Sequence, residues 1–182
     1  MMKQFGDTAR NNSSGAFTMR IVISDGPLGV NWQHASETCE FLGDVFALHH
    51  AKGGSDYTDA RHSIIYLVNE LLENAIKFRV PGAIRIDCSL EDGNFELTVS
   101  NDTAPEVATR FQALIEEIIS RDPGELLIER IEANAADESS SGSGLGLLTL
   151  MNDYGARLGW DFISSTSGAA VTLSTHAALT LN

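Results

Sequence analysis

Three polar side chains recur along one stripe of a predicted helix and could bind a metal-bound phosphate. The segment from His62 to Arg79 (HSIIYLVNELLENAIKFR) has apolar residues at helical spacing and contains neither proline nor glycine. Glu70, Asn74 and Lys77 lie at positions i, i+4 and i+7, so a carboxylate, an amide and an amine fall beside the apolar face. A solvated helix face can carry the same three residues, and their spacing alone leaves both interpretations open.

A second segment has the glycine spacing of a phosphate-binding loop. Gly142, Gly144 and Gly146 lie in SGSGLGLL, about seventy residues after Asn74, where a helix is predicted to start near Leu145. Glycines let backbone amides approach a phosphate closely, and a helix N-terminus adds about half a positive charge. A flexible Ser/Gly loop before an ordinary helix has a similar composition, so it is the order of the two segments that favours a phosphate site.

Together, the motifs E-L-L-x-N-A-x-K-F and G-S-G-L-G-L resemble those of the GHKL ATPase superfamily. This superfamily includes gyrase, heat-shock chaperones, mismatch-repair ATPases, histidine kinases and anti-sigma factor kinases. The resemblance extends roughly from Ile64 to the C-terminus. It implies a Bergerat-type ATP-binding fold, which is an α+β two-layer sandwich with a mixed, mainly antiparallel sheet covered on one face by helices. ATP and Mg²⁺ are the cofactors that it implies.

The resemblance also implies a role for each polar residue. Asn74 stands where the family's asparagine binds Mg²⁺. Glu70 stands where the ATP-hydrolysing and Ser/Thr kinase members carry a base for the attacking nucleophile. Lys77 resembles a contact to phosphate or to the lid, and a solvated surface lysine fits the same position. The box that closes over the triphosphate corresponds to Gly142, Gly144, Leu145 and Gly146.

The segment that should bind adenine departs from the family pattern. The family has D-x-G-x-G directly after the second strand of a hairpin, whereas this chain has SNDTAP from Ser100 to Pro105, without glycine. Asn101 aligns best with the family's aspartate, and Asp102 is the alternative. An amide carbonyl can accept the same hydrogen bond as a carboxylate, so either residue could recognise adenine. Altered base preference and lost nucleotide binding are also consistent with the missing glycines.

The composition is typical of a globular protein and restricts the classes of partner. One domain is predicted over residues 16–182 of the 182, after a disordered N-terminus over residues 1–15. Because no long apolar segment or signal region is found, we expect a cytoplasmic location and no membrane partner. A formal net charge of −13 without a Lys/Arg cluster argues against nucleic acid. Cys39 and Cys88 lack metal-ligand spacing and are predicted to be reduced.

The hydrophobic pattern predicts the elements that would position these residues. Alternating segments predict strands over residues 16–24, 83–90, 95–100, 159–165 and 169–176. Helical periodicity predicts helices over residues 31–50, 62–79, 105–120, 124–134 and 145–158. Residues 135–143 have no periodicity and are predicted to form a loop. This order suits a sheet with helices on one face.

Two functional hypotheses follow from these features. The first, implied by the resemblance, is a stand-alone Ser/Thr kinase of the anti-sigma factor type, which binds Mg-ATP and phosphorylates a small regulatory protein, commonly of the STAS class. The second is a non-catalytic docking module with a degenerate nucleotide pocket, which the missing glycines motivate. A histidine kinase fragment is disfavoured because Glu70 replaces the asparagine that is usual there. A homodimer is compatible with either hypothesis.

Overall fold

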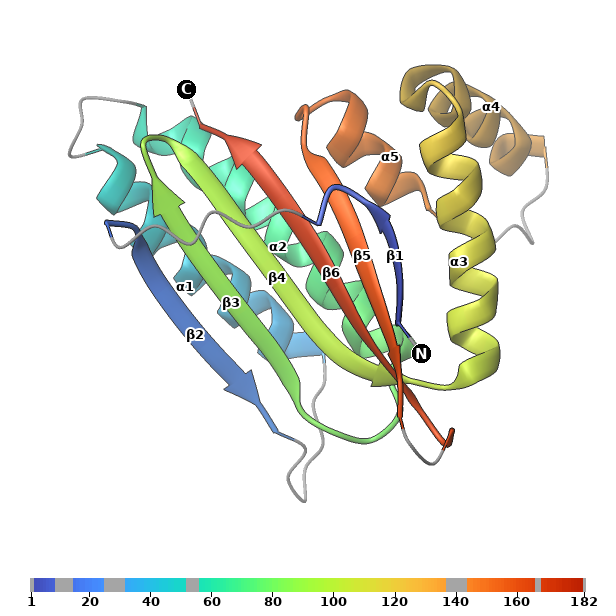
Figure 1. The fold of residues 1–182 in the computed structure, drawn as a ribbon. Coiled ribbons are helices and arrows are strands. Elements are labelled where there is room, and N and C mark those ends of the chain that lie inside the picture. Colours follow the sequence, from blue (N-terminus) through green and yellow to red (C-terminus); the bar gives the residue numbers. More distant parts are fainter. Residues whose placement is uncertain are drawn as a thin grey trace.

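In the computed structural model, one six-stranded sheet and five helices form an α+β two-layer sandwich (Figure 1). The fold class predicted from the sequence is therefore confirmed. The structure describes residues 2–8, 15–24, 32–51, 56–136, 144–165 and 168–181. Within these ranges, no helix has the length and hydropathy needed to cross a bilayer.

The sheet is antiparallel at every pair of neighbouring strands, with the order β1-β5-β6-β4-β3-β2. The sequence predicted a mixed, mainly antiparallel sheet, but the described strands contain no parallel pair. The strands are β1 (Met2–Gly6), β2 (Phe17–Ile23), β3 (Ile84–Glu91), β4 (Asn94–Thr103), β5 (Arg157–Ser164) and β6 (Val171–Thr180). Of these, β4 and β6 both run further than predicted.

The helices gather on one face of the sheet. In the view of Figure 1, α1 and α2 lie behind the sheet, and α3, α4 and α5 lie toward the edge that ends in β1. The helices are α1 (Trp32–Ala51), α2 (Tyr57–Phe78), α3 (Pro105–Ser120), α4 (Pro123–Ala136) and α5 (Leu145–Asn152). The second helix, α2, packs along α1 and against β4 and α5, so it occupies the centre of the helical layer.

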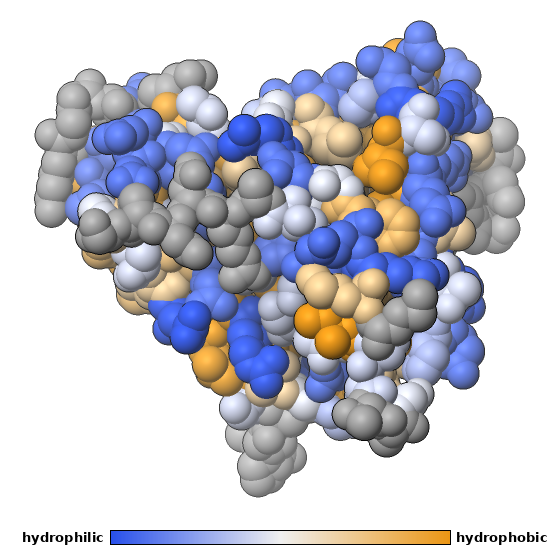
Figure 2. Space-filling model, in the orientation of Figure 1, coloured by the Kyte–Doolittle hydropathy of each residue, from blue (hydrophilic) through white to orange (hydrophobic). Residues whose placement is uncertain are grey.

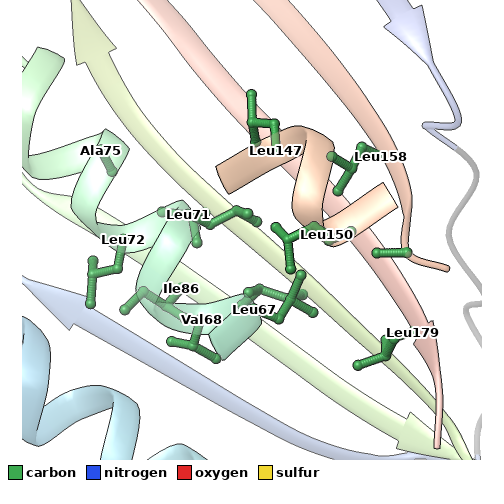
Figure 3. Packing of buried hydrophobic residues seen from close by; sticks show 14 of the residues in the cluster. Leu67, Val68, Leu71, Leu72, Ala75, Ile86, Leu147, Leu150, Leu158 and Leu179 are labelled. Carbon is green, nitrogen blue, oxygen red and sulfur yellow. The ribbon is translucent and has the colours of Figure 1, made fainter. Parts of the chain in front are cut away.

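Leucine, isoleucine and valine side chains from α2, α5 and the sheet form the core between the layers. Figure 3 shows this packing, in which the apolar face of α2 meets side chains of α5 and of the sheet. The α2 residues that are at most 2% exposed are Ile64, Leu67, Val68, Leu71 and Leu72. Their helical spacing is the pattern seen in the sequence. Burying each such side chain contributes roughly 1.5–3 kcal/mol to the stability of the folded state.

Alternation along β4 separates the helix-covered face of the sheet from an open face. Phe95, Leu97 and Val99 are buried under the helices. Successive side chains of a strand point to opposite faces, so the intervening residues lie on the open face. Figure 2, drawn from that side, shows hydrophilic areas with smaller, separate hydrophobic ones.

A chain of hydrogen bonds crosses four strands on the open face. His176 on β6 is 3.0 Å from Thr98 Oγ1 on β4 through Nδ1, and 2.9 Å from Asp161 Oδ2 on β5 through Nε2. The side chain of Gln4 on β1 donates to Asp161 Oδ1 at 2.8 Å. The side chains of Thr98 and His176 are buried, so these bonds satisfy polar groups that would otherwise destabilise the fold.

The helix α2 begins at Tyr57, five residues before the predicted His62. Asp56 caps it, because its side chain accepts a hydrogen bond from the Thr58 N–H at 2.7 Å. The Tyr57 hydroxyl donates to Asp44 of α1 at 2.9 Å, and Arg61 pairs with the same carboxylate. These contacts between helices stabilise a first turn that has too few apolar residues to show helical periodicity in the sequence.

The expectation of a disordered N-terminus is wrong for residues 2–6, which form β1. This strand pairs with β5 from Met2 opposite Ile163 to Gly6 opposite Gly159. Phe5 packs edge-to-face on the ring of Phe162, with centroids 5.7 Å apart. Five residues cannot form a strand without a partner, and the partner is more than 150 residues away in sequence. Residues 9–14, also predicted to be disordered, lie outside the described part of the chain.

The helix predicted over residues 145–158 is also wrong at its C-terminal end, because α5 ends at Asn152. Gly155 has a φ of +63°, a left-handed conformation that glycine adopts without strain. The Ala156 N–H donates to the carbonyl of Leu150 at 2.9 Å and closes the helix end. The chain then enters β5 at Arg157, so residues 157 and 158 belong to the sheet.

Replacing Phe5 by alanine tests whether β1 is part of the folded structure. We expect Phe5→Ala to lower the free energy of unfolding by about 1–2 kcal/mol, less than for a fully buried phenylalanine because the ring is half-buried. Urea denaturation measures this difference. Met2→Ala is the matched control, since Met2 is 53% exposed. Equal, negligible effects of the two changes would contradict the pairing of β1.

Candidate functional site

The polar stripe of α2 and the glycines that start α5 line the same cavity. The cavity has a volume of about 570 Å³, and β4, β6 and α3 form its other walls. The residues predicted for the site that line it are Glu70, Asn74, Lys77, Asn101, Gly144 and Gly146. Segments about seventy residues apart in the sequence therefore face one space. Gly142 lies outside the described residues, and Leu145 packs against the core without lining the cavity.

The carboxylate of Glu70 lies directly against the backbone of Gly146. A Cβ atom at position 146 would overlap Glu70 Oε2 and lie 3.2 Å from Oε1. Glycine at this position therefore leaves the space that the carboxylate occupies. Gly146 is in the first turn of α5, where backbone N–H groups have no partners within the helix. A carboxylate is electrostatically favoured at such a helix N-terminus.

The surroundings of Glu70 raise the pKa of its carboxyl. Burial is the main cause because it penalises the charged form, and the charge of Glu73 adds to the increase. A hydrogen bond with the Tyr66 hydroxyl acts in the opposite direction. The ring of Tyr66 stacks on Tyr154, with centroids 4.8 Å apart. A carboxylate with a raised pKa is a stronger proton acceptor, which suits a general base.

Asn101 and Asp102, the two candidates for adenine recognition, lie on opposite faces of β4. Asn101 is 3% exposed and lines the cavity. Its amide nitrogen donates to the backbone carbonyl of Asp102 at 3.3 Å, which leaves the amide oxygen to accept a hydrogen bond from a ligand. Asp102 instead lies on the open face, where its carboxylate accepts a hydrogen bond from Thr172 at 2.6 Å. The structure thus brings Asn101, and not Asp102, to the cavity.

The N-cap of α5 is a glycine in a left-handed conformation. Gly144 has a φ of +87°, and a Cβ there would lie 2.9 Å from Arg130 Nη1 and 3.3 Å from Leu114 Cδ1. The left-handed backbone conformation therefore favours glycine, and a Cβ atom would also require the end of the Arg130 side chain to move. With Gly146 two residues further along, in the first turn, the start of α5 presents backbone at both positions to the cavity, as an anion site requires.

Two cationic side chains line the cavity, and the sequence indicated only one of them. Lys77 is exposed and its Nζ lies 5.1 Å from the centroid of the Phe78 ring. Arg110, on α3, is also exposed and lines the same cavity. Arg110 was missed because a charged residue on the polar side of an amphipathic helix is typical of any surface helix. Both side chains bring positive charge to a molecule whose net charge is −13.

Two threonines, Thr103, which is buried, and Thr175, which is half-buried, also belong to the site and were not predicted. Thr103, at the end of β4, donates to the backbone carbonyl of Phe78 at 2.7 Å, which ties the strand to the end of α2. Thr175 lines the cavity from β6. Threonine is common in strands, so neither residue gave a functional signal in the sequence.

Neither a protein-family model nor a curated protein sequence matches this chain. Within the described residues, no group of three or more His, Cys, Asp or Glu side chains could hold a metal ion. A Mg²⁺ ion in the cavity would therefore need oxygen atoms from a ligand as well as the amide oxygen of Asn74. This is the usual arrangement for Mg²⁺, which binds through few protein groups, phosphate oxygens and water.

The pH dependence of stability tests the environment of Glu70. The raised folded-state pKa means that ionising this carboxyl disfavours the folded state. This loss of folding stability is absent below the ordinary glutamate pKa of about 4.3, and it develops as pH rises through the pKa of the folded state. We therefore expect the stability of the Glu70→Gln variant, relative to wild type, to increase as pH rises from about 4 to about 7. Urea denaturation at both pH values measures this, with Glu106→Gln, at an exposed position of α3, as control. A difference that does not change with pH would contradict the raised pKa.

A double-mutant cycle tests the contact between Glu70 and Gly146. We expect Gly146→Ala to destabilise the protein by about 1 kcal/mol, because the new methyl group displaces the carboxylate. In the Glu70→Ala background the same change should be neutral or stabilising, since alanine favours helices over glycine by about 1 kcal/mol. Thermal and urea denaturation of the four proteins give the coupling energy. Identical effects of Gly146→Ala in both backgrounds would show that the two residues do not touch.

Proposed function

We propose that this protein binds Mg-ATP in the cavity and transfers the terminal phosphoryl group to a serine or threonine of a small regulatory protein. One observation carries the proposal: the polar stripe of α2, Asn101 of β4 and the glycine start of α5 line a single cavity. A volume of about 570 Å³ suits a ligand of nucleotide size. The two motifs that resemble those of the GHKL superfamily supply the residues on opposite walls.

The proposed site would hold a nucleotide from base to phosphate. The amide oxygen of Asn101 accepts a hydrogen bond from the exocyclic amine of adenine. The first turn of α5 binds phosphate oxygens through backbone N–H groups, and Lys77 and Arg110 add positive charge nearby. Asn74 holds Mg²⁺ through its amide oxygen. When bound, the ion neutralises negative charge on the phosphates.

Glu70 is the residue we assign as the base. In phosphoryl transfer the protein mainly positions the groups and stabilises charge, and a carboxylate accepts the proton of the attacking hydroxyl. The contact with Gly146 places this carboxylate at the start of α5, next to where the phosphates would bind. The partner we propose is a regulatory protein of the STAS type or another anti-sigma factor antagonist, as the resemblance implies.

A non-catalytic docking module is the second candidate function. The observation that favours it is the orientation of Asp102, which lies on the open face and leaves the base end of the cavity with a neutral amide. In such a module the cavity would be a remnant, and the protein would act through its surface. The two functions differ in whether the protein binds nucleotide.

Thermal denaturation with nucleotide tests the proposal. At about 100 times its dissociation constant, Mg-ATP should stabilise the folded protein by roughly 2.7 kcal/mol and raise Tm. Asn101→Leu should abolish the increase with ATP, whereas Asp102→Leu, on the other face of the same strand, should preserve it. Glu70→Gln should preserve ATP binding and abolish phosphoryl transfer to a STAS-type protein. If no nucleotide changes Tm, the kinase proposal is wrong and the docking module is favoured.

A further inference from the structure

The outward surface of α4 consists of an apolar row beside an acidic row. Ile128 and Ile131 are 61% and 52% exposed, and Ala135, one turn further, is exposed as well. At 3.6 residues per turn these three side chains form one row along the helix. The adjacent row consists of the exposed residues Glu125, Glu129 and Glu132. Neighbouring exposed apolar side chains with a polar rim have the arrangement of an interaction surface.

The opposite side of α4 packs against the rest of the molecule. Leu126 and Leu127 are buried, and Arg130 pairs with Glu117 of α3 at 2.8 Å. Arg130 also lies 2.9 Å from where a Cβ atom of Gly144 would be, at the N-cap of α5. Figure 1 shows α4 at one end of the molecule, beyond α3 and α5 and away from the sheet. The two rows therefore face outward, on the side of α4 opposite the one that contacts the start of α5.

The charges on α4 indicate which class of partner fits. Glu129 pairs with Arg121 at 2.5 Å, and this hydrogen bond lowers the pKa of the glutamate. The charge of Glu125 also reaches Arg121, but within the described residues neither Glu125 nor Glu132 forms an ion pair. The acidic row on a chain of net charge −13 repels anionic lipid and nucleic acid, and it repels the same face of a second copy.

We propose that the outward face of α4 docks a basic amphipathic helix of a partner protein. Apolar side chains of the partner would cover Ile128 and Ile131, and its Lys or Arg residues would lie against Glu125 and Glu132. Recognition of an amphipathic helix by an apolar row with flanking charges is a common mode of peptide binding. Charge complementarity of this kind supplies specificity and fast association.

The location of α4 indicates which protein would dock there, an inference that rests on the proposed function. A partner held on the outward face of α4 is one helix width from Gly144, because Arg130, on the packed side of the same helix, lies close to Gly144 at the cavity. The docked protein would then be the phosphoryl acceptor, held beside the site by a surface separate from the reacting groups. Docking itself requires no nucleotide, so it can be tested independently.

Fluorescence anisotropy with a designed peptide tests the docking face. The probe is a labelled helical peptide of about 15 residues with leucine at i, i+3 and i+7 and a neighbouring row of lysines. A scrambled peptide of the same composition is the control for general attraction to an acidic protein. We expect the probe to bind about tenfold more tightly than the scrambled peptide, because only the probe presents both rows.

Two pairs of substitutions locate the binding. Ile128→Ser with Ile131→Ser should weaken probe binding about tenfold, through lost apolar burial. Glu125→Lys with Glu132→Lys should weaken it and reduce its dependence on salt. Phe41→Ser is the matched control, since Phe41 is 49% exposed on α1. Circular dichroism verifies that all variants are folded.

Three outcomes would overturn the proposal. One is equal affinity for the probe and the scrambled peptide, and another is unchanged probe binding by the Ile128/Ile131 variant. The third is a dimer in light scattering that this variant converts to a monomer, because a second copy would then occupy the face. The Mg-ATP shift in Tm is measured on the same proteins. If the probe binds but Mg-ATP does not raise Tm, only the nucleotide proposal is rejected. If Mg-ATP raises Tm but the probe does not bind, only the docking proposal is rejected.

Discussion

The candidate site depends on the packing of α2 and the short helix α5 in one core. The eight residues of α5 bury Leu147, Leu148 and Leu150. In Figure 3, Leu150 points toward the apolar face of α2. Because Glu70 and Asn74 are on the same helix as those core residues, core packing also determines where the polar stripe points. The glycines at the start of α5 then lie opposite the carboxylate. The site is thus positioned by the hydrophobic core, which resists displacement because protein interiors are closely packed.

The sheet supplies a second constraint of the same kind. Alternation along β4 leaves only one of two neighbouring polar residues facing the helices, so Asn101 reaches the cavity and Asp102 reaches Thr172 on the open face. A shift of the β4–β6 register by one residue would exchange them. The antiparallel pairing with β6 fixes this register over ten residue pairs. Strand pairing therefore determines that an amide, and not a carboxylate, of β4 lines the cavity.

Features governed by local periodicity could be predicted from the sequence, and those governed by distant contacts could not. The apolar face of α2 and the hairpin of β3 and β4 were predictable from residue spacing. The order of the two motifs indicated a shared site for α2 and the start of α5, but not the direct contact of Glu70 with Gly146. The pairing of β1 with β5 was not, because MKQFG has a single large apolar residue and its partner is far away in sequence. The end of α5 was missed because its leucine pattern continues to Leu158, and Arg110 was missed because its neighbours in the cavity come from other elements.

The pairing of β1 has a consequence for the edge of the sheet. Without β1, the terminal strand of the sheet would be β5, which contains Trp160 and Phe162 and would expose unpaired backbone groups along its length. Such a strand is a template for adding strands from other molecules, as in aggregation and amyloid. With β1 in place, the terminal strand is only five residues long and has Lys3 and Gln4 near its centre. Both features discourage the addition of further strands. The strand β1 thus protects this edge of the sheet from self-propagating assembly.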